Sequence, residues 1–199
     1  MRYWSRELHF MTYNLFNVNM IEQFSAINSW FGSEVIGDEY LHIKIFLLEG
    51  KKWYLVVYFF IWTNFFFRLI KHFHALNIPI AVATSSSTST LAEKTKNHRE
   101  LFDLFHHVVT GSHPDLKNGK PAPDIFLLCA SMFNPAPDPA KCLVFEDAPN
   151  GIQAACDSGM QSVMVPHQSL GSQYTLKATQ VIHSLIDFQP SDFGLPAFR

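Results

Sequence analysis

Residues 141–155 read KCLVFEDAPNGIQAA and combine a strand pattern, a pair of carboxylates and a helix pattern in immediate succession. Leu143–Phe145 is a continuous apolar run, as expected of a strand that is buried on both faces of a parallel sheet. Glu146 and Asp147 follow it directly, and Pro149–Ser158 has the spacing of a helix that begins with proline. A strand that leads at once into a helix indicates an α/β fold.

The same alternation of short apolar runs and helical patterns continues on both sides of this segment. The expected strands are Ile78–Ala83, Val108–Thr110, Val163–Val165 and Val181–Ile182, and the expected helices are Arg68–Asn77, Leu91–Phe105 and Ile125–Phe133. Parallel strands need crossover helices that cover both faces of their sheet. The pattern therefore predicts a parallel sheet between two helical layers.

Ligands of such sheets bind at the carboxyl ends of the strands, and three of these ends carry polar side chains. Thr84, Ser85 and Ser86 follow one strand and offer hydroxyls and backbone amides to an anion, although a flexible polar linker would have the same composition. Lys120 lies just before an expected helix, where its charge suits a phosphate. Taken singly, an ordinary surface lysine is the simpler interpretation.

Glu146 and Asp147 are adjacent carboxylates at the end of a buried strand. Placing two anions there is unfavourable unless a cation compensates their charge. Carboxylate oxygens with few other protein contacts suit Mg²⁺. The pair therefore predicts a magnesium site at this edge of the sheet.

Three motifs together resemble a known family. ATSS (residues 83–86), GKPAPDIF (119–126) and VFEDAPNG (144–151) resemble, in order and spacing, motifs two, three and four of the haloacid dehalogenase superfamily. The resemblance covers residues 68–199 and is strongest to the phosphatases that act on pseudouridine 5'-phosphate. It implies a haloacid dehalogenase-like, Rossmannoid three-layer α/β sandwich.

The resemblance also implies roles for individual residues. Members of this superfamily hydrolyse phosphate monoesters with Mg²⁺, through an aspartate that attacks phosphorus and a second aspartate that protonates the leaving oxygen. Thr84 and Lys120 would then stand at the catalytic centre and bind the phosphate, with Ser85 beside them. Asp147 would ligate Mg²⁺, with Glu146 in the same acidic site. The implied substrate is a small nucleoside monophosphate.

The first motif of the superfamily, a D-x-D pair followed by glycine, is not found in this sequence. Asp38 is the one aspartate before residue 103, and it has no partner at the required spacing. The segment that comes nearest to this motif is Ile45–Gly50, which places Leu47 at the nucleophile position and Glu49 at the general acid position. The sequence therefore predicts that the chain is inactive or nearly so.

The missing motif also affects the expected architecture, because the strand that carries it is central in the family's sheet. We expect a core that is incomplete at its amino-terminal strand and lacks a recognisable cap. Ile43–Leu48 and Tyr54–Ile61 are both apolar enough to fill the central position.

Composition changes sharply near residue 68. Residues 1–67 contain 19 of the 29 aromatic residues and no proline, whereas residues 68–199 contain all 11 prolines. We therefore expect an atypical amino-terminal segment over 1–67 and a phosphatase-like core over 68–199. An alternative is a non-catalytic chain that binds Mg²⁺ and phosphate weakly or acts through interactions. In a further alternative, residues 53–67 anchor it to a membrane, although about 15 uncharged residues fall short of the roughly 20 a span requires.

Charge and cysteine content indicate the class of ligand and the cellular compartment. A net charge of -2 gives no electrostatic basis for binding nucleic acid. Three scattered cysteines suit buried thiols better than a disulfide framework, and no secretion signal is recognisable. We expect a cytoplasmic monomer that acts on a small phosphate monoester.

Overall fold

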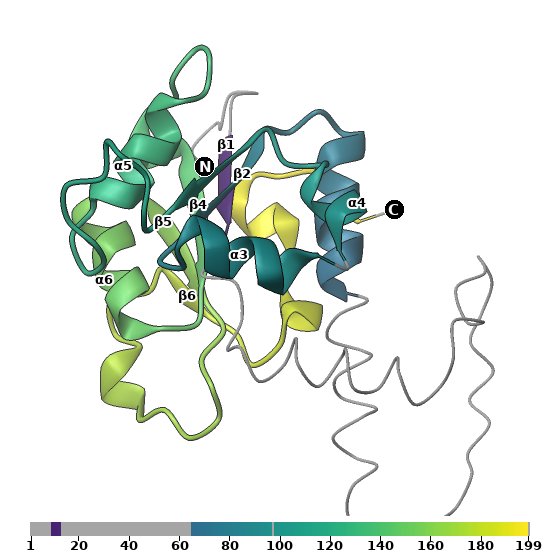
Figure 1. The fold of residues 1–199 in the computed structure, drawn as a ribbon. Coiled ribbons are helices and arrows are strands. Elements are labelled where there is room, and N and C mark those ends of the chain that lie inside the picture. The colour runs from purple at the N-terminus through teal and green to yellow at the C-terminus, as the bar shows by residue number, and fades with distance from the viewer. Residues whose placement is uncertain (1–8, 13–64, 97, 199) are drawn as a thin grey trace, which may run out of the picture. The chain divides into compact units, whose positions relative to one another are not determined.

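The protein's structure, a computed structural model, describes residues 9–12, 65–96 and 98–198 (Figure 1). The strands are β1 His9–Thr12, β2 Ile80–Thr84, β3 His107–Thr110, β4 Cys142–Glu146, β5 Gln161–Met164 and β6 Gln180–Val181. The α-helices are residues 65–75, α3 Thr88–Thr95, α4 Arg99–Phe102, α5 Asp124–Ser131 and α6 Pro149–Asp157. Short 3₁₀ helices are η1 Pro139–Lys141, η2 Ser172–Tyr174, η3 Leu185–Asp187 and η4 Pro190–Phe193.

The described strands form one parallel sheet in the order β3-β2-β1-β4-β5-β6. Helices α5 and α6 lie on one side of this sheet, and the helix of residues 65–75 lies on the other with the carboxyl-terminal segment (Figure 1). Strands β2 and β4 are buried along their whole length, as their apolar sequences predict. The expected three-layer α/β fold is confirmed.

Strand β1 occupies the centre of the sheet, which corrects the expectation that Ile43–Leu48 or Tyr54–Ile61 fills this position. Phe10 is the register partner of Ile80 on β2 and of Leu143 on β4. The two segments expected there lie outside the described residues. Four residues that include a histidine and a threonine carry too little apolar pattern to be recognised as a central strand.

The sheet also joins the two segments that composition separates near residue 68. One compact unit of the chain contains Met1–Leu15 and Trp62–Arg199, and a second contains Phe16–Ile61. All of the described residues belong to the first unit. The boundary between 67 and 68 stays a prediction, and β1 shows that the amino-terminal segment contributes to the sheet.

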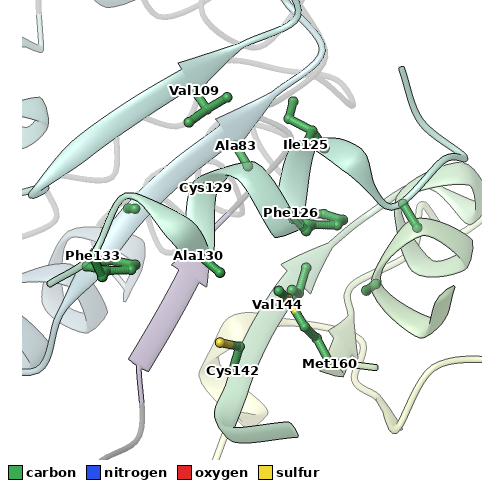
Figure 2. Packing of buried hydrophobic residues seen from close by; sticks show 13 residues of the cluster. Ala83, Val109, Ile125, Phe126, Cys129, Ala130, Phe133, Cys142, Val144 and Met160 are labelled. Atoms are coloured by element: carbon green, nitrogen blue, oxygen red, sulfur yellow. The ribbon is translucent and has the colours of Figure 1, made fainter. Parts of the chain in front are cut away.

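A core on the α5 and α6 side of the sheet holds these layers together (Figure 2). Ala83 of β2 and Val144 of β4 pack there with Phe126 and Cys129 of α5 and with Ala155 of α6, and all five are fully buried. The cysteines are free, with Cys129 and Cys142 buried and Cys156 exposed. Burial raises the pKa of Cys129 and that of Cys142 to about 12, so both thiols stay protonated at neutral pH.

One expected helix, Leu91–Phe105, is two helices, α3 and α4. Helix α3 begins three residues earlier than expected because the Ser87 hydroxyl accepts a hydrogen bond from the Thr90 backbone N–H at 3.2 Å and caps its first turn. His98 has a non-helical backbone and precedes α4. Serine and threonine residues that read as a loop thus supply a helix cap.

Within the described residues, no helix combines the length and the apolar character that a bilayer span requires. Of the candidate anchor over 53–67, only residues 65–67 are described, and they begin the helix over 65–75. The remainder of that segment lies outside the described residues.

Asn77 follows the helix of residues 65–75 and has a φ of 53°, in the left-handed region. Asparagine, aspartate and glycine adopt this conformation readily, whereas most other residues are strained there. We expect Asn77→Ala to lower the free energy of unfolding by about 1 kcal/mol. Asn77→Gly should leave it within about 0.5 kcal/mol, because glycine has no Cβ atom. Urea denaturation of the two variants checks this, and equal losses would contradict it.

Candidate functional site

The site is built at the edge of the sheet where the central strands end. Thr12 of β1 is the register partner of Val82 on β2 and of Phe145 on β4. Strand β2 then ends at Thr84 and β4 at Glu146. The topology therefore places the ends of β2 and β4 on the two sides of β1, and the polar residues that follow them share one edge of the sheet.

The residues after β2 form a defined turn. Thr84 is fully buried, and its Oγ1 accepts a hydrogen bond from the Ser86 backbone N–H at 3.2 Å. Because this oxygen accepts the backbone bond, its own O–H remains able to donate to a ligand. The Ser86 hydroxyl accepts a hydrogen bond from Lys94 Nζ at 3.0 Å, and Ser85 is exposed.

The loop after β3 supports this turn from the side. The Gly111 N–H donates to the Ser86 carbonyl at 2.9 Å, and a Cβ atom at Gly111 would clash with the Ser85 carbonyl. The Thr88 hydroxyl also lies 3.0 Å from the hydroxyls of Thr110 and of Ser112. The close approach that only glycine permits therefore fixes the position of the loop that would face an anion.

Lys120 and Glu146 form a buried ion pair. The Lys120 ammonium donates to Glu146 Oε1, and their side chains are 4% and 0% exposed. The same ammonium donates to the Ala83 carbonyl at 3.3 Å, directly before Thr84 in the chain. The structure therefore brings Lys120 and Glu146 into contact beside the end of β2, where Thr84 lies, and Lys120 is not an ordinary surface lysine.

Both oxygens of Glu146 are engaged. Oε1 accepts from Lys120, and Oε2 accepts from the Asp147 backbone N–H at 3.3 Å. Burial raises the pKa of Glu146, and the charge of Lys120 opposes this shift. A buried carboxylate without its cation would be strongly destabilising, which makes each member of the pair depend on the other.

The Asp147 carboxylate has a different environment. Its Oδ1 atom is buried and has no hydrogen-bond partner among the described residues. Burial raises the pKa of Asp147, with backbone hydrogen bonding and Lys120 as opposing influences. A buried oxygen that accepts no hydrogen bond is suited to a cation, so this atom fits the predicted magnesium site.

No group of three histidine, cysteine, aspartate or glutamate side chains that could hold a metal ion occurs among the described residues. Beside the engaged Glu146, the carboxylate available to a cation is that of Asp147. Mg²⁺ commonly keeps several water ligands and uses one or two carboxylates. Asp147 is compatible with such an ion but does not form a complete protein cage for it.

Two residues that sequence reasoning missed support the ion pair. A Cβ atom at Gly151 would fall on the Glu146 carboxyl group, so the first turn of α6 can approach that group only with glycine. Phe126 of α5 places its ring centroid 4.6 Å from Lys120 Nζ. Both residues stand inside the quoted motifs, but a motif does not show which atoms touch.

The haloacid dehalogenase-like hydrolase family matches residues 60–159 of this chain. The match spans half of the sequence and includes the three strand-end motifs described above. The chain belongs to the haloacid dehalogenase-like hydrolases. This confirms the resemblance that the motifs suggested.

Curated relatives agree with this assignment. The chain is 54% identical over 132 residues to the "Probable pseudouridine-5'-phosphatase" of Drosophila melanogaster, covering 66% of this chain and 57% of the relative. It is 53% identical over 133 residues to "(DL)-glycerol-3-phosphatase 2" of Arabidopsis thaliana, covering 66% of this chain and 55% of the relative. The chain thus spans about half the length of the curated relatives it matches.

Solved structures support the same fold. A putative β-phosphoglucomutase from Thermotoga maritima is 29% identical, with a TM-score of 0.51 and coverage of 57% of this chain and 51% of that one. A haloacid dehalogenase-like protein of Agrobacterium tumefaciens reaches a TM-score of 0.54 over 90% of this chain and 95% of that one. At 17% identity, the second comparison bears on the fold alone.

The contact between Gly151 and Glu146 gives a direct test of the site's construction. We expect Gly151→Ala to lower the free energy of unfolding by about 1–3 kcal/mol, because the added methyl group displaces a buried, ion-paired carboxylate. Gly119→Ala is the matched control, since a Cβ atom at this exposed glycine meets nothing within 4 Å. Denaturant titration of the two variants measures the difference, and equal stability would contradict the prediction.

The buried Asp147 carboxylate predicts a pH-dependent stability. Because its pKa is raised in the folded state, its contribution to the free energy of unfolding is complete at low pH and is lost as pH rises through that pKa. Without divalent ions, Asp147→Asn should therefore raise the Tm at pH 7.5, with a smaller gain at lower pH.

Exposed Asp103→Asn is the control for charge removal and should show no such pH-dependent gain. Thermal melts in EDTA across the pH range measure the effect. A lower Tm for Asp147→Asn at pH 7.5 would show that this carboxylate is stabilised within the fold and would contradict the prediction.

Proposed function

We propose that this chain is a phosphate-monoester binding protein of the haloacid dehalogenase-like phosphatases whose own hydrolytic turnover is very slow. The observation that carries the proposal is the buried Lys120 ammonium, held at the strand ends next to Thr84 while Asp147 Oδ1 stands without a hydrogen-bond partner. A cation, a hydroxyl donor and an open carboxylate at one sheet edge suit a phosphate with its counter-ion.

The phosphate would be held by residues of the β2 end and by Lys120. The Thr84 Oγ1 accepts one hydrogen bond from Ser86, and its O–H can donate to a phosphate oxygen. The exposed Ser85 offers a second hydroxyl. The Lys120 charge offsets negative charge on the phosphoryl oxygens. Because the ammonium is already held in place before a ligand binds, little reorganisation of the site is needed on binding.

Mg²⁺ would be held by Asp147, with Glu146 beside it. Both Glu146 oxygens already accept hydrogen bonds. We therefore assign the direct contact with Mg²⁺ to Asp147, and we assign to Glu146 the indirect role of holding the Lys120 ammonium in place. When bound, the ion supplies positive charge to a phosphoryl oxygen and orients the group. We expect millimolar or weaker affinity, because the D-x-D carboxylates that would complete the site do not occur in the sequence.

The substrate class follows from the relatives, whose names differ. One is named for pseudouridine 5'-phosphate and another for glycerol 3-phosphate. We propose a small phosphate monoester, with pseudouridine 5'-phosphate as the first candidate. The net charge of -2 favours this class over nucleic acid. Cytoplasmic location and a monomeric state belong to the same proposal.

Slow turnover follows from the residues after β1. The central strand ends at Thr12, and the next acidic residue in the sequence is Glu22, so no D-x-D pair follows the strand. Loss of a nucleophile costs about 10⁶ in turnover in other enzymes, while binding and electrostatics retain a small advantage over water. We expect hydrolysis at least roughly 10⁴ times slower than that of an intact relative.

The test installs the missing motif where the strand ends. Tyr13→Asp, Leu15→Asp and Phe16→Gly together place D-x-D-G directly after β1, and we expect at least a tenfold gain (about 1.4 kcal/mol) in Mg²⁺-dependent turnover. Leu47→Asp, which makes residues 45–50 more similar to the motif, is the matched control and should give no gain in turnover. A release assay with pseudouridine 5'-phosphate measures both.

Two results would overturn this proposal. One is turnover by the unaltered chain within tenfold of an intact relative and abolished by changing one acidic residue among residues 1–67. The other is calorimetry that detects binding of neither phosphate nor Mg²⁺ even at ligand concentrations well above the millimolar range. Phosphate binding without turnover is the expected result for the unaltered chain, and Lys120→Met should abolish it.

A further inference from the structure

The Lys120 ammonium has a third close neighbour besides Glu146 and the Ala83 carbonyl. The centroid of the Phe126 ring lies 4.6 Å from Nζ, within the range of a cation–π interaction. The lysine side chain is 4% exposed and Phe126 is fully buried, so water screens this contact little. Desolvated cation–π contacts are the stronger ones.

The position of the ring is itself fixed by the start of α5. The Phe126 backbone N–H donates to the Pro123 carbonyl at 3.0 Å, in the turn that follows the Lys120 segment. Its side chain belongs to the core cluster with Val144 of β4, and Figure 2 shows both side chains in that cluster. The ring therefore belongs to the rigid core, whereas the lysine ends a flexible four-carbon chain.

We propose that Phe126 is a positioning residue for Lys120, and that its aromatic face helps hold the ammonium between Glu146 and the β2 end. This rests on the proposed function in one respect, because a phosphate is the group toward which the positioned charge would act. An ammonium has three N–H donors, and the hydrogen bonds to Glu146 and to the Ala83 carbonyl use two of them. An aliphatic side chain of similar size would fill the space without attracting the charge.

The experiment separates the electrostatics of the ring from its volume. Phenylalanines with one, two and three fluorine atoms, incorporated at position 126 of the full chain, weaken the negative ring face and change the packing little. We expect the Tm to fall at each step of the series. The same series in a Lys120→Met background, which also carries Glu146→Gln so that no unpaired buried carboxylate remains, should be flat because no cation remains above the ring.

Phe145 is the matched control position. It is also fully buried, and its ring packs edge-on against Phe188 at 4.9 Å between centroids. The fluorinated series at position 145 should be independent of Lys120→Met. A spectroscopic readout accompanies the melts: the Lys120 ε-methylene protons, identified by their loss in Lys120→Met, should move downfield when Phe126→Leu removes the ring current.

Two outcomes of the melts and spectra would overturn the proposal. The first is a Tm series at position 126 that is flat, or that is the same with and without Lys120. The second is an unchanged Lys120 resonance in Phe126→Leu. Inorganic phosphate titration then tests the functional consequence: Phe126→Leu should weaken phosphate binding by about 3- to 10-fold, and trifluorophenylalanine at position 145 should not.

The phosphate arm distinguishes the two proposals. If the unaltered chain binds no phosphate, the proposed function fails, and the role of Phe126 is still decided by the Tm series and the Lys120 resonance. If phosphate binds but responds equally to the changes at 126 and 145, Phe126 acts through packing alone and the positioning role is wrong.

Discussion

The buried ion pair between Lys120 and Glu146 is the constraint on which the site depends. Each charge is almost fully removed from water, so the loss of either one would leave a buried unpaired charge and strongly destabilise the fold. The pair links the segment before α5 to the end of β4, and the bond from Lys120 to the Ala83 carbonyl adds the end of β2. Three pieces of chain that are distant in sequence are thereby held at one edge of the sheet.

Close backbone approach makes this arrangement possible. Gly151 lets α6 reach the Glu146 carboxyl group, and Gly111 lets the loop after β3 reach the turn at Ser85. The Phe126 ring of α5 lies against the Lys120 ammonium and belongs to the buried core. The groups proposed to bind phosphate are therefore supported by the same packing that stabilises the fold, and a phosphate would meet charges that are already in place.

The proposed function separates phosphate binding from chemical attack. Thr84, Lys120 and Asp147 lie on β2, before α5 and after β4, all of which belong to the segment that matches the phosphatase relatives. The attacking carboxylate of the family follows the central strand, where this sequence continues with Tyr13 and Asn14. A chain with the first set and without the second would retain electrostatic recognition of phosphate and lose most of its catalytic power.

The sequence by itself determined the parallel α/β fold and the strand ends that carry polar groups. Strands that are buried on both faces, such as Leu143–Phe145, are continuous apolar runs and can be recognised in the sequence. The order and spacing of the motifs can likewise be read directly along the chain. Only the tertiary structure decided that His9–Thr12 is the central strand, since pairing with β2 and β4 outweighs a weak local pattern. It also decided that Glu146 is paired with Lys120 while Asp147 Oδ1 has no partner, because adjacent carboxylates differ only in the neighbours that folding brings to each.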